Sequence, residues 1–509
     1  MNFFRNLKKN YFIFSIIIFI LVPLGYLPQL YDGVLIDYAY KSGNIDSIEF
    51  WYKDAIRYSH FYIIYLINIF SKFTLLPHEF FLDLFSVLFL ILYCLETKKI
   101  AKLIFNLNEK YCNLAAFFTS IFPVWHTLVA FNISQYLFSF YCVLFGYRNF
   151  ISNNPTKVFV GFIFIILSFE VESSLSFIIG LSFVHLLLNR KNKIRNLGLS
   201  KVIFIFCLCF IYYVFKTSFF PPTGYWENYN NINFSLLSNL SVNKIVPNIF
   251  NYSTFLITFI WIPFFYYFKI IFKKTTTIKK ITKYNLFYNE YFLLILLSAF
   301  AIFPYVLLNK SSTIFYLADF YQRHAFLLAP IFGIFFATLF SGMEKVNFDQ
   351  KKIVLNFYLF FFISINLVLL SYGSIRKIEA HHFKNNLITE FKNYGAIPKG
   401  DVQIISKNYP ADLRTFEISY MLYKAYNKTA WWGFMANKPE ERKPTKIKGI
   451  SIVNKKEYSR LNIISDYFYE CKSYIYLKND LNKLNRLRKF YVINYKNYFI
   501  FDKIVSECK

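Results

Sequence analysis

Long apolar segments recur along the first 370 residues, and they restrict the fold of this chain more than any other feature. We count about twelve of them, and a helix needs about 20 apolar residues to cross a bilayer. Hydrophobic residues make up 56% of the 509 positions and aromatic residues 22%. Soluble domains rarely have such a composition, so we expect a bilayer to be the solvent for most of the chain.

Basic residues cluster between the apolar segments and predict the orientation of the chain. Segments 96–110, 190–201 and 269–283 are rich in lysine, and the positive-inside rule places them in the cytoplasm. The N-terminal lysines also indicate the cytoplasmic side. The N-terminus and segment 96–110 can both be cytoplasmic only if the short segment 61–73 does not cross the membrane, and is instead re-entrant or lies on the membrane surface. We therefore predict about eleven crossings, with the N-terminus inside and the C-terminus outside. The basic residues that give the formal charge of +28 lie where the positive-inside rule predicts them, between apolar segments. We therefore expect no nucleic-acid partner.

The polar C-terminal part predicts a separate domain. We assign residues 1–371 to a transmembrane module and residues 372–509 to a small periplasmic α/β domain. Short β-like runs, such as DVQIIS and YFIFD, alternate there with a helical pattern over 414–428. Cys471 and Cys508 would both be periplasmic, in a compartment that allows a disulfide between them, and the sequence leaves their pairing open.

The predicted first periplasmic loop, residues 28–60, is acidic, although the chain has 57 basic and only 29 acidic residues. Asp37 and Asp32 directly follow the first apolar segment and lie among tyrosines. Asp37 is the first candidate for a general base, and Asp32 is the second unless its Asp-Gly pair only makes a turn. The other acids lie on an amphipathic pattern that favours a surface-lying helix; they are Asp46, Glu49 and Asp54.

A second acidic element is the segment SFEVESSLSF, which contains Glu170 and Glu172. Our topology places it at the periplasmic mouth, where ionisable side chains are costly and are candidates for function. One interpretation is a hairpin whose carboxylates face water. The other is a pair of metal ligands or hydrogen-bond partners for sugar hydroxyls.

A basic element precedes a later crossing on the outer side. Arg323 violates the positive-inside rule there, and a phosphate would explain it because a guanidinium binds phosphate with two parallel hydrogen bonds. Snorkelling or an ion pair with Asp319 is the alternative. His324 is a further phosphate contact or an ordinary interfacial residue, and Arg57 and His60 are weaker phosphate-binding candidates of the same kind.

The order of these features resembles the GT-C superfamily of integral-membrane glycosyltransferases. IDYAYKSGNID, residues 36–46, is similar to the acid–x–x–Tyr–Ala kind of pattern that follows the first helix in several branches, and the two segments after it are similar in rhythm. The resemblance implies transfer of a sugar from a polyprenyl-phosphate or diphosphate carrier. It also implies a carboxylate that acts as base or metal ligand in the first outer loop.

We therefore expect an enzyme of the bacterial inner membrane that adds a sugar to an envelope glycan, such as O-antigen or lipopolysaccharide, on the periplasmic face. Asp37 would deprotonate the acceptor, and Arg323 would stabilise the phosphate leaving group. No cofactor is certain, but Mg²⁺ or Mn²⁺ would fit a metal-binding role of the acids. An O-antigen polymerase, a polysaccharide transporter or flippase, and a scaffold stay open as alternatives.

Overall fold

The structure, a computed structural model, divides into two compact units. It describes residues 57–76, 78–122, 124–125, 134–192, 199–221, 290–307, 324–344, 364, 387–393, 401–405, 425, 433–436, 471–479 and 499–508. The first unit comprises Met1–Gly25, Asp83–Pro221 and Asn230–Ser374, and the second comprises Tyr26–Leu82, Pro222–Tyr229 and Ile375–Lys509.

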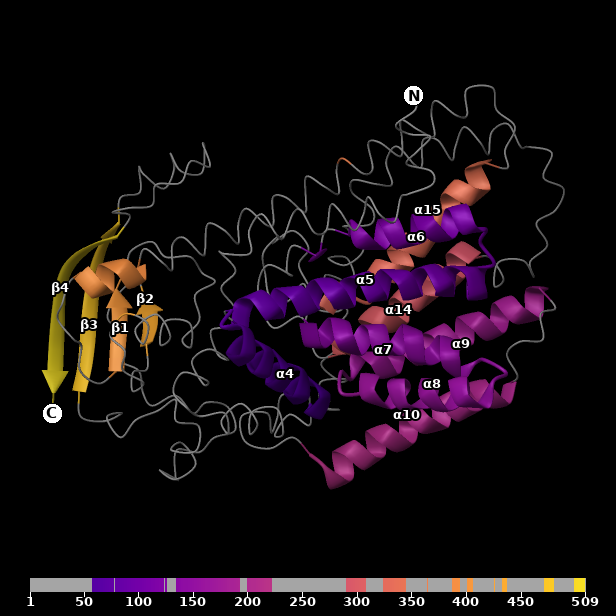
Figure 1. Cartoon of the computed structure of the whole chain (residues 1–509), viewed down its shortest axis with the longest axis horizontal. Helices are drawn as coiled ribbons and strands as arrows, with labels where there is room; N and C mark the ends of the chain where they lie inside the picture. Colours follow the sequence, from indigo (N-terminus) through magenta and orange to yellow (C-terminus); the bar gives the residue numbers. More distant parts are fainter. Residues whose placement is uncertain are drawn as a thin grey trace. The chain divides into compact units, whose positions relative to one another are not determined.

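The described part of the first unit is a bundle of helices (Figure 1). These are α5 (His78–Phe105, which begins in the second unit), α6 (Glu109–Ser120), α7 (Ser134–Phe150), α8 (Pro155–Ser168), α9 (Ser173–Asn192), α10 (Leu199–Phe219), α14 (Glu290–Leu307) and α15 (Leu328–Glu344). Two helices start at asparagine caps: Asn108 Oδ1 accepts a hydrogen bond from Tyr111 N, and Asn154 Oδ1 accepts from Thr156 N. These caps set the starts of α6 and α8.

The helices pack in pairs: α7 against α8, α6 against α15, and α9 against α14 and α10. Residues 151–154 form the whole connection between α7 and α8, so the two helices are antiparallel neighbours. They approach closely at Gly161, where an added Cβ would lie 2.6 Å from the carbonyl oxygen of Gly146. At Gly333 an added Cβ would meet Thr119 and Ala115 of α6. Glycine therefore lets the backbones of these helices come together.

The prediction of about eleven crossings in a GT-C-like membrane fold is wrong. Within the described residues, only Leu199–Phe219 is long and apolar enough to cross a membrane. The other apolar helices are shorter; they are Pro155–Ser168, Ser173–Asn189, Glu290–Tyr305 and Leu328–Ser341. At 1.5 Å per residue, a 14-residue helix such as α8 extends about 21 Å, less than the roughly 30 Å hydrocarbon core. Counting apolar runs together with their aromatic flanks overestimated the number of crossings.

One segment has a different structure from the one that the charge pattern indicated. The basic segment 96–110 is not simply a loop, because α5 continues as a helix to Phe105. The segment 61–73 lies within a regular helix, α4 (Tyr58–Thr74), and its place at a membrane surface stays a prediction. In both cases helix bounds are set by local backbone hydrogen bonding, which charge and hydropathy do not report.

The strands of the second unit form one four-stranded sheet in the order β2-β1-β3-β4 (Figure 1). They are β1 (Asp401–Ile405), β2 (Gly433–Ala436), β3 (Cys471–Asn479) and β4 (Phe499–Cys508). β1 is parallel to both β2 and β3, whereas β3 and β4 are antiparallel. The runs DVQIIS and YFIFD fall on β1 and β4. The helical pattern predicted over 414–428 lies outside the described residues, apart from residue 425.

The β3–β4 register supports one testable prediction. Position 471 lies directly opposite position 508, and opposite positions of antiparallel strands have Cα atoms about 4.5–5.5 Å apart, within the disulfide range. If the C-terminal part lies in an oxidising compartment, we expect these two cysteines to be oxidised. Intact-mass measurement of protein alkylated without reduction should find two blocked thiols, and Cys471→Ser should free Cys508. Alkylation of both cysteines in the unreduced wild type would contradict the prediction.

Candidate functional site

Two of the predicted site residues, Glu170 and Glu172, lie in the short turn between α8 and α9. Several helix ends meet around this turn. Lys216 is in the last turn of α10, Tyr305 lies near the end of α14, and His324 precedes α15. We call these residues the turn cluster; it comprises Glu170, Glu172, Ser173, Lys216, Tyr305 and His324.

An ion pair closes one side of the turn cluster. Lys216 Nζ lies 2.8 Å from Glu172 Oε1 and donates a hydrogen bond to it. The Lys216 side chain is only 7% exposed, whereas the Glu172 side chain is 30% exposed. A lysine this deep needs an anionic partner, because removing an ammonium group from water is costly. The carboxylate remains accessible to an incoming molecule.

Glu170 lies deeper than Glu172. It is a buried residue, and its carboxylate lies within electrostatic range of the Cys142 thiol of α7 and the Tyr212 phenol of α10. Buried carboxylates in proteins are held by hydrogen bonds or charges. The turn therefore presents one partly exposed and one buried carboxylate, two positions apart.

A hydrogen bond joins the turn to α14 on the other side. The Tyr305 hydroxyl donates to Ser173 Oγ over 2.8 Å. The ring of Tyr305 also stacks on the imidazole of His324, with centroids 4.3 Å apart and planes 22° from parallel. Both contacts are buried. They bring His324 from a distant part of the chain to the same turn as the two glutamates.

A proline in α14 explains how Tyr305 is held. Pro304 has no backbone N–H, so it cannot make the helical hydrogen bond to the carbonyl of Phe300. Ser176 Oγ of α9 donates a hydrogen bond of 2.7 Å to that carbonyl instead. The proline therefore provides an acceptor that ties α14 to α9, immediately beside Tyr305.

An aromatic layer holds the chain two residues after His324, at Phe326. Tyr93 of α5 donates a hydrogen bond of 3.2 Å to the carbonyl of Phe326. The Trp125 ring contacts both Tyr93 and Phe326, at centroid distances of 6.3 and 5.0 Å. All three side chains are fully buried. The turn that carries His324 is therefore fixed by packing against rigid rings.

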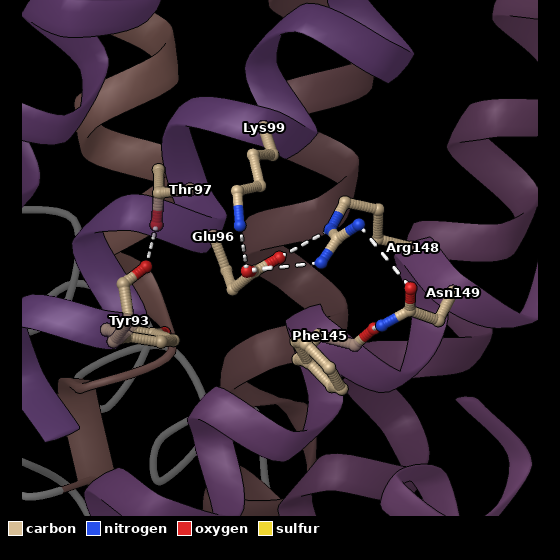
Figure 2. Close-up of polar contacts among 7 residues, drawn as sticks. All are labelled: Tyr93, Glu96, Thr97, Lys99, Phe145, Arg148 and Asn149. Carbon is tan, nitrogen blue, oxygen red and sulfur yellow. Dashed lines mark hydrogen bonds and ion pairs between the residues drawn. The ribbon is translucent and has the colours of Figure 1, made fainter. Parts of the chain in front are cut away.

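A second charged group is a buried ion network between α5 and α7, drawn in Figure 2. Arg148 donates from Nε to Glu96 Oε2 over 2.6 Å and from Nη2 to Oε1 over 3.3 Å. Lys99 Nζ donates to Glu96 Oε1 over 2.7 Å, and Asn149 accepts from Arg148 Nη1. The Glu96 side chain is 3% exposed. Because Glu96 is saturated by donors and closed to solvent, we interpret this network as a structural link between helices.

The other predicted site residues do not join the turn cluster in the described structure. Asp32, Asp37 and Arg323 lie outside the described residues. Arg57 directly precedes α4, and His60 is buried in its first turn. Both belong to the second unit, whereas the turn cluster belongs to the first.

Sequence reasoning missed four important residues: Lys216, Tyr305, Glu96 and Arg148. A lysine near the end of an apolar helix is a signal that could have identified Lys216, since ionisable groups at such positions are candidates for function. The pairing of Glu96 with Arg148 has no local signal. The sequence pattern places Glu96 in a loop between two apolar segments, where it would face water.

The turn cluster contains carboxylate, ammonium, phenol and imidazole groups, which suit hydrogen bonding to sugar hydroxyls and contact with an anion. The residues present fit a metal poorly, since one of the two carboxylates is paired with Lys216. Within the part of the chain that the structure describes, no three His, Cys, Asp or Glu side chains form a metal-binding group. We therefore assign no step to a metal.

No family model matches this chain, and no curated protein or solved structure matches it. The resemblance to the GT-C superfamily thus stays a prediction from the sequence.

Proposed function

We propose that this chain is a membrane-bound glycosyltransferase of the bacterial inner membrane. It would move a sugar from a polyprenyl-phosphate or diphosphate carrier to an envelope glycan, and the turn cluster would form part of its substrate site. The observation that carries the proposal is the meeting of Glu170, Glu172, Lys216, Tyr305 and His324 beside α10. This is the described helix that is long and apolar enough to cross a bilayer.

The surface of α10 supports attachment to a membrane. Large apolar side chains are exposed along its length, including Phe210 at 70% and Ile211 at 61%. An exposed apolar surface of this extent is typical of a membrane or protein contact. Lys216 and Glu172 lie at one end of this helix, where the headgroup of a lipid carrier would lie if α10 crosses the bilayer.

The charges of the turn cluster support a role in binding a phosphorylated sugar. In this proposal the Lys216 ammonium contacts the phosphate that leaves with the lipid, and Glu170 and Glu172 accept hydrogen bonds from sugar hydroxyls. The acceptor hydroxyl attacks the anomeric carbon, its proton passes to a carboxylate, and the bond from that carbon to the phosphate oxygen breaks. Asp37 stays the first candidate for the base.

Complementation of a deletion strain tests the proposal. We expect Glu172→Gln to lower glycan transfer roughly 100-fold, because a neutral amide leaves Lys216 without its anionic partner at the proposed phosphate contact. The readout is the envelope glycan on a gel and by mass spectrometry, with membrane levels checked by blot. Wild-type glycans from Glu172→Gln and Lys216→Met, both present at normal levels, would overturn the proposal.

Glu109→Gln is the matched control. Glu109 is 58% exposed and pairs with Lys98 at 2.5 Å, outside the turn cluster. The hydrogen bond from Lys98 lowers the pKa of this carboxyl below its ordinary value of 4.5, so Glu109 is ionised at neutral pH. Its neutralisation should leave the glycan unchanged. Collapse of the glycan ladder to one repeat unit in the Glu172 variant would indicate a polymerase instead.

A further inference from the structure

The turn between α4 and α5 exposes apolar side chains at its apex. We call residues 73–76 the α4–α5 tip; its members are Phe73, Thr74, Leu75 and Leu76. Phe73 is 87% exposed and Leu75 is 91% exposed. Adjacent exposed apolar side chains are typical of a contact with a membrane or a protein, so the environment of the tip needs an explanation.

The backbone of Leu75 makes its presence more unusual. Its φ angle is 60° in the left-handed region, where it ends α4 as the C-cap. Glycine usually occupies such a position, because a side chain there is strained. In water, leucine at this place is unfavourable both for the backbone and for its exposed side chain. Burial of the side chain in an apolar phase would remove the second of these costs.

Two hydroxyl side chains satisfy the backbone N–H and carbonyl of Leu76 within the turn. Ser71 Oγ donates a hydrogen bond of 2.5 Å to the carbonyl of Leu76. Thr74 Oγ1 donates to the carbonyl of Phe70 over 2.7 Å and accepts from Leu76 N over 3.4 Å. The next residue in the sequence is a proline, which has no backbone N–H. A turn that enters lipid must satisfy its backbone in this way, because no water is present to do so.

The exposed face of α4 continues the apolar surface of the tip. Its large exposed side chains are Tyr58, Tyr62, Tyr65, Leu66, Ile69 and Phe70. Tyrosine is typical of the membrane–water interface. Lys72 is the one Lys, Arg, Asp or Glu in the sequence of α4, and its long side chain can reach a lipid phosphate beside an inserted tip.

From these observations we propose that the α4–α5 tip inserts into the lipid surface. Phe73, Leu75 and Leu76 would enter the outer part of the acyl chains, and Lys72 would stay among the phosphates. The insertion is shallow because charged or polar residues flank the tip on both sides, with His78 and Glu79 at the start of α5. Lys72 beside the tip and the exposed tyrosines of α4 favour a lipid surface over a protein partner. The proposal does not depend on glycosyl transfer.

Fluorescence quenching in vesicles tests this proposal with the full-length protein. A clickable non-natural amino acid at position 75 carries an environment-sensitive dye, which avoids the native cysteines. The protein is reconstituted in vesicles whose lipids carry bromine near the headgroup end or near the methyl end of the acyl chains. We expect a blue-shifted emission that is quenched more strongly by bromine near the headgroup end. The matched control is position 153, an exposed asparagine in the α7–α8 turn, where we expect neither effect.

Leu75→Asn separates insertion from folding. Asparagine tolerates the left-handed region but is polar, so the turn should keep its structure. With the dye at position 73, this substitution should reduce the quenching and leave the melting temperature unchanged. Dye emission that no brominated lipid quenches would overturn the proposal. So would a blue shift that persists in lipid-free detergent and grows with protein concentration, since this would indicate a second copy of the chain.

Discussion

Replacement of Glu96 by leucine should destabilise the helical unit by about 3 kcal/mol, at the lower end of the range for a broken buried ion pair. The substitution removes the carboxylate that Arg148 contacts through two nitrogens, and the Arg148 side chain is only 24% exposed. The guanidinium would then stay in the protein interior without an anion. The fall in melting temperature of the detergent-solubilised protein, followed by tryptophan fluorescence, measures the effect.

Two further variants show whether burial of the charge is the cause. Lys99→Met removes the more exposed partner of Glu96 and should cost less than about 1 kcal/mol, as exposed ion pairs do. The double substitution Glu96→Leu with Arg148→Met removes the buried charge altogether and should recover most of the lost stability. Equal losses from Glu96→Leu and Lys99→Met would contradict our interpretation of the network.

Gly161→Ala should destabilise the contact between α7 and α8 by about 2 kcal/mol, because overpacking against fixed atoms costs about 1–3 kcal/mol or more. An added Cβ at this position would lie 2.8 Å from the Cα of Phe150 and 2.6 Å from the oxygen of Gly146. Both are backbone atoms, which cannot rotate away as a side chain can. The melting temperature in detergent again measures the effect.

Gly146→Ala is the matched control, since it makes the same substitution on the opposite side of the same contact. Its Cβ would lie 2.9 Å from the nitrogen of Ile165 and 3.0 Å from the oxygen of Gly161. Alanine gains about 1 kcal/mol of helix propensity at either position, so the difference between the two variants reports the packing. If Gly146→Ala proves the more harmful of the two, the packing described for α7 and α8 is wrong.

Local features of the sequence predicted local structure well. The run DVQIIS falls on a strand because alternating and β-branched residues fit a sheet. The sequence also identified Glu170 and Glu172 as an acidic pair in a turn. Each of these inferences depends on residues within a few positions of one another.

The number of membrane crossings could not be obtained in the same way. Apolar composition identifies a helix that is shielded from water, but a membrane and the interior of a bundle both provide that shield. For α15, whose Ile331 and Phe336 are almost completely buried, the shield is other helices. For α10, which exposes Phe210, other helices do not provide that shield. Only the packed structure distinguishes the two cases.

The sequence by itself determined that apolar helices dominate the first part of this chain and that two glutamates share a turn. Tertiary structure decided what those glutamates meet. Glu172 pairs with Lys216 from 44 positions away, Ser173 bonds Tyr305 from 132 positions away, and Glu96 meets Arg148 from 52 positions away. Helix and turn signals act over a few residues, whereas the choice of neighbouring helices depends on how their surfaces fit, as at Gly161. The candidate site arises from that choice of neighbours, so the local sequence could not reveal it.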